Sequence, residues 1–230
     1  MIRLFFLTFF LFVQFSCFGH TLSEAFTKAE VGDFVVFAEQ KHLTLFRIAA
    51  STEDEIAIEE ITIPASLIDL TAVSWKKWLE EEAPHYSSWT VTRFEKKSGT
   101  LISCLSKVNH EWIENKPLFV FLPTLFQLPL VPVPKDEQKR IGPAPMAGEI
   151  DRRKLWVPKV IVNGKELLPP PPFEVYRTKW PKDGGELSEK TIYLYFPVSK
   201  EALSYFPYWV EIVGIVGKVK LRVVDSGKGL

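Results

Sequence analysis

Cysteine is scarce in this chain of 230 residues, which contains only two. Two cysteines cannot build the disulfide framework that holds small exported domains together. An excess of either charge is also absent, because 28 basic residues balance 28 acidic ones. Nucleic-acid binding normally needs a clustered basic excess, so we expect no nucleic-acid partner. With 47% hydrophobic residues, the chain is expected to be globular and held by its apolar core.

Charge is almost missing from the N-terminus, where Arg3 is the only charged residue among the first nineteen. It precedes the ten-residue apolar run Leu4–Val13, a pattern typical of a secretory signal peptide. A transmembrane helix needs about 20 apolar residues, so the run is too short for a permanent anchor. We predict that residues 1–19 are a signal peptide and that the protein is exported to the periplasm or the cell envelope.

A second interpretation of the same region is lipidation. The segment Val13–Cys17 resembles a bacterial lipobox, in which Cys17 carries the lipid and becomes the mature N-terminus. Ser16 fits that pattern, whereas Gln14 stands where an aliphatic residue is usual. A lipid anchor at Cys17 is the only membrane contact that we expect. If cleavage instead follows residue 19, the mature chain keeps a single cysteine and has no internal disulfide.

Short runs of β-branched and aromatic residues, divided by polar turns, indicate strands along most of residues 20–230. The first three are predicted to form a β-meander, and the Asn163–Gly164 pair is typical of a tight hairpin. The predicted strands are Asp33–Phe37, Leu43–Ile48, Glu55–Ile63, Trp89–Phe94, Thr100–Ser106, Phe173–Trp180, Thr191–Phe196, Trp209–Val216 and Lys218–Val224.

One helix is predicted, over Ser66–Glu82, where apolar residues recur at helical spacing. Thirteen of the 17 prolines lie between positions 117 and 181, which excludes long helices there. Within this proline-rich middle segment we expect a strand at Leu118–Leu122 and a polar surface loop at Lys135–Arg153. The predicted fold is therefore a single mostly-β domain, a β-sandwich or an open barrel, with a subdivision near 135–155 as an alternative.

The loop that follows the predicted helix combines an imidazole, a phenol, hydroxyls and an indole, from His85, Tyr86, Ser87 and Trp89. Loops on a rigid scaffold often carry binding residues. The same residues suit a hydrolase in which His85 activates Ser87, with an unidentified acid as third partner. They also suit a structural role, in which their polar groups bond the backbone at the helix end.

Other residues with catalytic potential favour structural interpretations. Cys104 lies in a predicted strand and is expected to be a packed cysteine rather than the nucleophile of a pair with His110. The segment Val223–Gly227 resembles the Asp-Ser/Thr-Gly motif of aspartic proteases over five residues only, and we interpret it as the turn that ends the last strand. Histidines lack the spacing of a metal site, so neither a metal nor a cofactor is expected.

Two apolar segments are candidate binding surfaces. The first, Leu118–Val133, contains Phe119 and Phe121 and is interrupted by prolines. The second contains Phe206, Tyr208 and Trp209. If these side chains are exposed, they mark an interface with a partner; if buried, they belong to the core.

Three motifs resemble those of uncharacterised exported proteins of Chlamydiae-type bacteria: Val31–Val36, Arg140–Pro143 and Phe206–Trp209. The resemblance implies an envelope setting and brings no known activity. We therefore predict an exported, non-enzymatic envelope protein that binds a protein partner or an apolar ligand. The alternative is a periplasmic hydrolase that uses His85 and Ser87.

Overall fold

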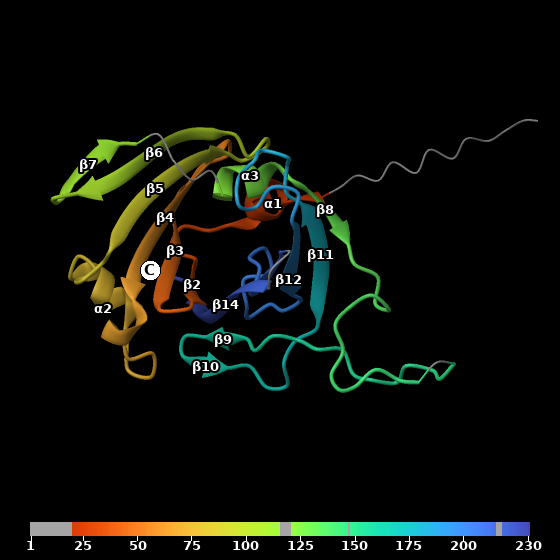
Figure 1. Cartoon of the computed structure of the whole chain (residues 1–230). Helices are drawn as coiled ribbons and strands as arrows, with labels where there is room; N and C mark the ends of the chain where they lie inside the picture. The colour runs from red at the N-terminus through yellow and green to blue at the C-terminus, as the bar shows by residue number, and fades with distance from the viewer. Residues whose placement is uncertain (1–19, 116–120, 147, 215–217) are drawn as a thin grey trace, which may run out of the picture.

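A computed structural model describes residues 20–115, 121–146, 148–214 and 218–230 of the chain (Figure 1). Within these ranges, twelve strands form one antiparallel sheet in the order β1-β8-β11-β12-β13-β14-β2-β3-β4-β5-β6-β7. Their bounds are β1 His20–Thr21, β2 Phe34–Glu39, β3 His42–Ser51, β4 Glu55–Pro64, β5 Ser88–Glu95, β6 Leu101–Val108, β7 Glu111–Glu114, β8 Pro129–Pro132, β11 Phe173–Lys179, β12 Thr191–Pro197, β13 Trp209–Val213 and β14 Lys218–Gly227. The mostly-β prediction is confirmed.

The remaining regular elements are short. Three α-helices are α1 Leu22–Ala25, α2 Trp75–Glu80 and α3 Phe121–Gln127, and two 3-10 turns lie at Phe26–Lys28 and Ala65–Leu67. The strands β9 Ile161–Val162 and β10 Lys165–Glu166 form a separate hairpin, as the Asn163–Gly164 pair predicted. Both residues of its turn have positive φ, 50° and 74°, which matches the twist of the paired strands.

The sheet is covered on both faces, and β2 shows why. Its residues Phe34 to Phe37 are all buried, although neighbouring side chains point to opposite faces. Val35 and Phe37 belong to the larger apolar core, on what we call the inner face. Phe34 and Val36 belong to a second core, on the outer face.

The inner face is covered by α1, α3 and the loop around residues 202–208. Phe26 and Phe126 lie between the sheet and these coverings, with ring centroids 4.7 Å apart. Phe126 also stacks on Phe94 of β5 at 4.8 Å, and Phe206 packs on Phe37. Figure 1 shows α1 and α3 between the two halves of the curved sheet, with β4–β6 on one side and β11–β12 on the other.

The outer face has two separate coverings. Over β2–β5, helix α2 buries Trp75 and Trp78 against residues such as Leu45 and Ile61. Over β11–β13, Trp156 from the proline-rich segment packs on a smaller cluster that includes Tyr195. Both faces of the central strands are therefore removed from water.

Two elements differ from the prediction. The helix expected over Ser66–Glu82 spans only α2, because Asp69 accepts hydrogen bonds from the backbone and hydroxyl of Thr71 and holds a turn instead. The strand expected at Leu118–Leu122 is also wrong where it can be assessed: Phe121 and Leu122 begin α3. Residues 118–120 lie outside the described ranges.

The segment Val223–Gly227 is part of β14 and not the predicted terminal turn. Asp225 is buried and accepts hydrogen bonds from Trp75 Nε1 at 3.0 Å and from the Gly164 amide at 2.9 Å. The Ser226 hydroxyl donates to the carbonyl of Ile161 at 2.7 Å. These two side chains fasten helix α2 and the β9–β10 hairpin to the sheet.

Gly227, the next residue of β14, lets the β9–β10 hairpin approach the sheet closely because it has no side chain. A Cβ atom at this position would lie 2.2 Å from Asn163 Oδ1 and 2.6 Å from a ring carbon of Phe34. A larger residue at position 227 would therefore force the side chains of Asn163 and Phe34 to move.

We predict that Asp225→Ala lowers the free energy of unfolding by about 3 kcal/mol, because the indole and amide donors that the carboxylate accepts from lose their acceptor. Urea denaturation followed by circular dichroism measures the change. Asp54→Ala is the matched control, because its ion pair with Lys97 is exposed on both sides and should contribute less than about 1 kcal/mol. Equal effects of the two substitutions would show that Asp225 does not anchor the coverings.

Candidate ligand-binding groove

Two adjoining hollows lie between the inner face of the sheet and α3. Their volumes are about 170 Å³ and about 610 Å³. Both are lined by Glu39, Phe46, Glu60, Phe121, Leu122 and Leu221, and we call their combined space the inner groove. The smaller hollow continues inward to core aromatics such as Phe126. The larger one extends over β5 and β6 to Thr92 and Cys104.

Glu60 is the exceptional side chain in this groove. Its neighbours across β4 are Phe46 on β3 and Thr90 on β5. The side chain is half-buried, and no hydrogen bond or ion pair to it occurs within the described residues. Burial alone raises the pKa of Glu60 above its ordinary value of 4.5.

The preceding residue, Glu59, shows how the same strand treats a carboxylate on its outer face. Arg47 pairs with Glu59 at 2.6 Å, and Trp89 Nε1 donates a hydrogen bond to it at 2.7 Å. The two adjacent glutamates on β4 therefore differ. Glu59 has an ion pair and a hydrogen bond, whereas Glu60 has neither among the described residues.

The charge of the groove has one sign. Glu39 and Glu186, both exposed, lie at its rim, and no Lys, Arg or His among the described residues lines either hollow. The walls are otherwise apolar, with a few uncharged polar groups such as Thr92. An apolar space with a few convergent polar groups is the usual form of a small-molecule site.

Two of the predicted aromatic residues line the groove. Phe121 borders both hollows and stacks on Trp180 at 5.6 Å, and Phe206 borders the smaller hollow. Tyr208 is fully buried in the core, where its hydroxyl donates to Ser226, and Trp209 points to the outer face against Trp156. Phe119 lies outside the described residues, as does the predicted lipidation site Cys17.

The loop that contains His85 forms no catalytic arrangement within the described structure. His85 is exposed, and the Ser87 hydroxyl donates to the carbonyl of Thr62 at 3.1 Å rather than to the imidazole. Trp89 is buried and donates a hydrogen bond to Glu59. The ring of Tyr86 packs edge-on against the Trp89 ring, with the ring centroids 5.3 Å apart. These residues therefore lie on the opposite face from the inner groove and contribute nothing to its lining.

Cys104 faces the larger hollow as a buried side chain, and the Thr92 hydroxyl contacts its sulfur at 3.8 Å. His110 lies in the turn after β6 and is 3.7 Å from Glu82. Among the described residues these two side chains make no contact with each other, and Cys104 is a buried side chain of β6. Among the described residues, no group of acidic, histidine or cysteine side chains has the arrangement of a metal site.

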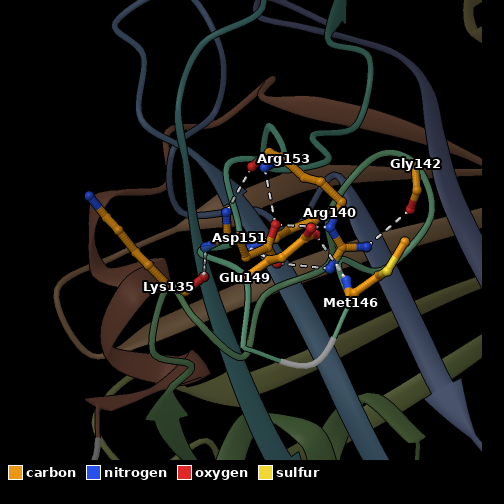
Figure 2. Close-up of polar contacts among 7 residues, drawn as sticks. All are labelled: Lys135, Arg140, Gly142, Met146, Glu149, Asp151 and Arg153. Carbon is orange, nitrogen blue, oxygen red and sulfur yellow. Dashed lines mark hydrogen bonds and ion pairs between the residues drawn. The ribbon is translucent and has the colours of Figure 1, made fainter.

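A polar cluster in the loop 135–155 is a second place where charged groups gather (Figure 2). Asp151 accepts two hydrogen bonds from the Arg153 guanidinium and lies 3.4 Å from Arg140. These contacts, led by the bond from Arg153, hold the pKa of Asp151 down at about 2. Arg140 and Arg153 also donate to backbone carbonyls, including that of Gly142. The cluster fixes the loop, and the neighbouring Arg152 is exposed.

The family model of the CT021 protein matches residues 44–168, more than half of the chain. The chain belongs to the CT021 protein family. The predicted resemblance to a chlamydial family is thereby confirmed. The matched range includes β4–β6 and α3, and with them Glu60 and Phe121.

A solved structure of the hypothetical protein CT021 from Chlamydia trachomatis has the same fold. Its TM-score is 0.64 at 20% sequence identity, over 91% of this chain and 93% of that one. A comparison with curated proteins gives no match. No helix in the described part of this CT021 family member is long and apolar enough to cross a membrane.

We predict that Glu60→Gln stabilises the protein at neutral pH by about 1 kcal/mol, because it removes a partly desolvated charge that has no partner in the described part of the chain. An acid whose pKa is raised by folding is favoured in its protonated form. The native state therefore loses stability as the pH rises from below 4.5 through the raised pKa, and the gain from Gln should vanish in acid. Thermal unfolding at several pH values measures it. Glu111→Gln, at an exposed site on β7, should change stability by less than about 0.5 kcal/mol.

Proposed function

We propose that this CT021 family member is an exported, non-enzymatic protein that binds an apolar ligand in the inner groove. The observation that carries the proposal is an apolar space of ligand size, bordered by Phe46, Phe121 and Leu221, beside the carboxyl of Glu60, which has no partner among the described residues. Sites for small molecules typically have volumes of about 300–1,000 Å³. The larger hollow, at about 610 Å³, lies within that range.

A small molecule suits this space better than a protein partner. The groove lies between α3 and the sheet, and its smaller hollow reaches core residues such as Phe26 and Phe126. A folded partner cannot insert so deeply without displacing the helix. A slender apolar molecule can enter it and remain in contact with side chains on most of its surface.

A binding role is also favoured over hydrolysis. Catalysis by Ser87 requires a base within hydrogen-bond reach, and its hydroxyl instead donates to Thr62. The export part of the proposal rests on residues 1–19, whose charged start and ten-residue apolar run are typical of a signal peptide. Such a protein would work in the periplasm or at an envelope membrane, with Cys17 as its candidate lipid anchor.

We expect native mass spectrometry of the protein, expressed from its full sequence and purified gently after export, to reveal excess mass that denaturation removes. The neutral fluorescent probe N-phenylnaphthylamine should bind the emptied protein. Leu221→Asp and Phe121→Asp should each weaken probe binding at least about tenfold, since either change places a charge on an apolar wall.

Ile113→Asp is the matched control, because Ile113 is 47% exposed on β7 and lies outside the groove. It should leave probe binding unchanged, and circular dichroism should show that all three variants are folded. A wild-type protein that carries no excess mass and does not bind the probe would overturn the proposal.

A further inference from the structure

The position of Glu60 indicates the charge of the ligand, which the apolar walls of the groove do not. Glu60 borders both hollows, so its carboxyl lies where they join. Apolar side chains lie to either side of this junction, including Val210 in the smaller hollow and Leu187 in the larger. A molecule that fills the groove must therefore pass its middle or its end close to a carboxylate.

A carboxylate in such a place is unfavourable unless a positive charge or several donors accompany it. Among the described residues neither is supplied, because no hydrogen bond or ion pair to Glu60 is present there. Arg47 is on the same sheet but belongs to the outer face, where it pairs with Glu59. Within the described part of the chain, the carboxyl is therefore open to a partner that a ligand brings.

The surroundings of Glu60 favour a positively charged nitrogen in that role. Phe46 lies directly across from Glu60 in the sheet and offers an aromatic ring, a surface that attracts organic cations. The hydroxyls of Thr90 and Thr92 line the larger hollow and can accept hydrogen bonds from an ammonium group. Glu39 and Glu186 at the rim add charge of the same sign and attract a cation from solution.

We propose that the inner groove selects amphiphiles that carry one positively charged nitrogen on an apolar body, with Glu60 as the counter-ion. This inference rests on the proposed function, because it assumes that the groove holds an apolar molecule. It adds the chemical class: a hydrophobic amine or quaternary ammonium, in preference to a neutral lipid chain or a fatty acid.

Competition between three probes of equal chain length tests the selectivity. Dodecylammonium, dodecanol and dodecanoate, each below the concentration at which it forms micelles, are titrated against bound N-phenylnaphthylamine at neutral pH. Dodecylammonium should displace the probe at least about tenfold more effectively than dodecanoate, because one charge-assisted hydrogen bond is worth about a factor of ten or more. Dodecanol should fall between them.

Glu60→Gln should remove most of the advantage of dodecylammonium over dodecanol, because glutamine carries no charge to pair with the ammonium group. The exposed control Glu111→Gln should keep the full preference. Glu39→Gln and Glu186→Gln should reduce it less than about threefold, since rim charges are screened by solvent.

The outcomes separate the two proposals. If the wild-type protein does not bind N-phenylnaphthylamine, the groove is not an apolar site and the proposed function fails. If it binds the probe and dodecanoate competes as well as dodecylammonium, the inference about charge is wrong while the proposed function stands. A preference for dodecylammonium that survives Glu60→Gln and disappears in Glu39→Gln or Glu186→Gln would also overturn the role given to Glu60.

Discussion

The constraint that governs this fold is that the central strands are buried on both faces. A sheet with one wet face can direct every charged residue to water, but here β2 has four consecutive buried residues and β4 alternates between two apolar cores. Any carboxylate placed on these strands enters a region of low polarity. It must then be neutralised or fully hydrogen-bonded, or it destabilises the fold.

Buried carboxylates accordingly serve to attach the coverings to the sheet. Asp225 binds Trp75 of α2 and the Gly164 turn on one side. Asp33, just before β2, accepts a hydrogen bond of 2.5 Å from Tyr205 in the loop that covers the inner face. Burial and this bond together raise the pKa of the Tyr205 phenol strongly, so it stays protonated and continues to donate. The layers are thus held by specific polar bonds as well as by apolar packing.

Much of the fold could be predicted from sequence because strand alternation is local. The meander, the hairpin at Asn163–Gly164 and the four C-terminal strands follow from short apolar runs between turns. The start of α2 at Trp75 was not predicted, because the turn that Asp69 forms with Thr71 replaces the first part of the expected helix. The role of Asp225 could not be predicted, because its partner Trp75 is distant in the sequence. Within the segment that ends at Trp209, only a structure separates the groove-lining Phe206 from its buried and outward-facing neighbours.

The candidate site had a faint sequence signal that alternation alone could have found. In a strand of isoleucines, Glu59 and Glu60 are consecutive, so one of them must point to each face. Alternation alone does not show that both faces of the sheet are covered, or that Arg47 and Trp89 bind only Glu59. These facts follow from the pairing of β3, β4 and β5.

Glu60 has no partner within the described ranges, and its carboxylate therefore responds differently to a neutral ligand and to a cationic one. A neutral apolar molecule in the inner groove would displace water from the carboxyl and raise its pKa further, so apolar contact and desolvation oppose each other. A cationic amphiphile would make the same apolar contacts and also pair with the carboxylate. Binding and charge neutralisation then act in one direction. A groove built only for neutral chains would be better with glutamine at this position, and the presence of Glu60 therefore argues for a ligand that uses its charge.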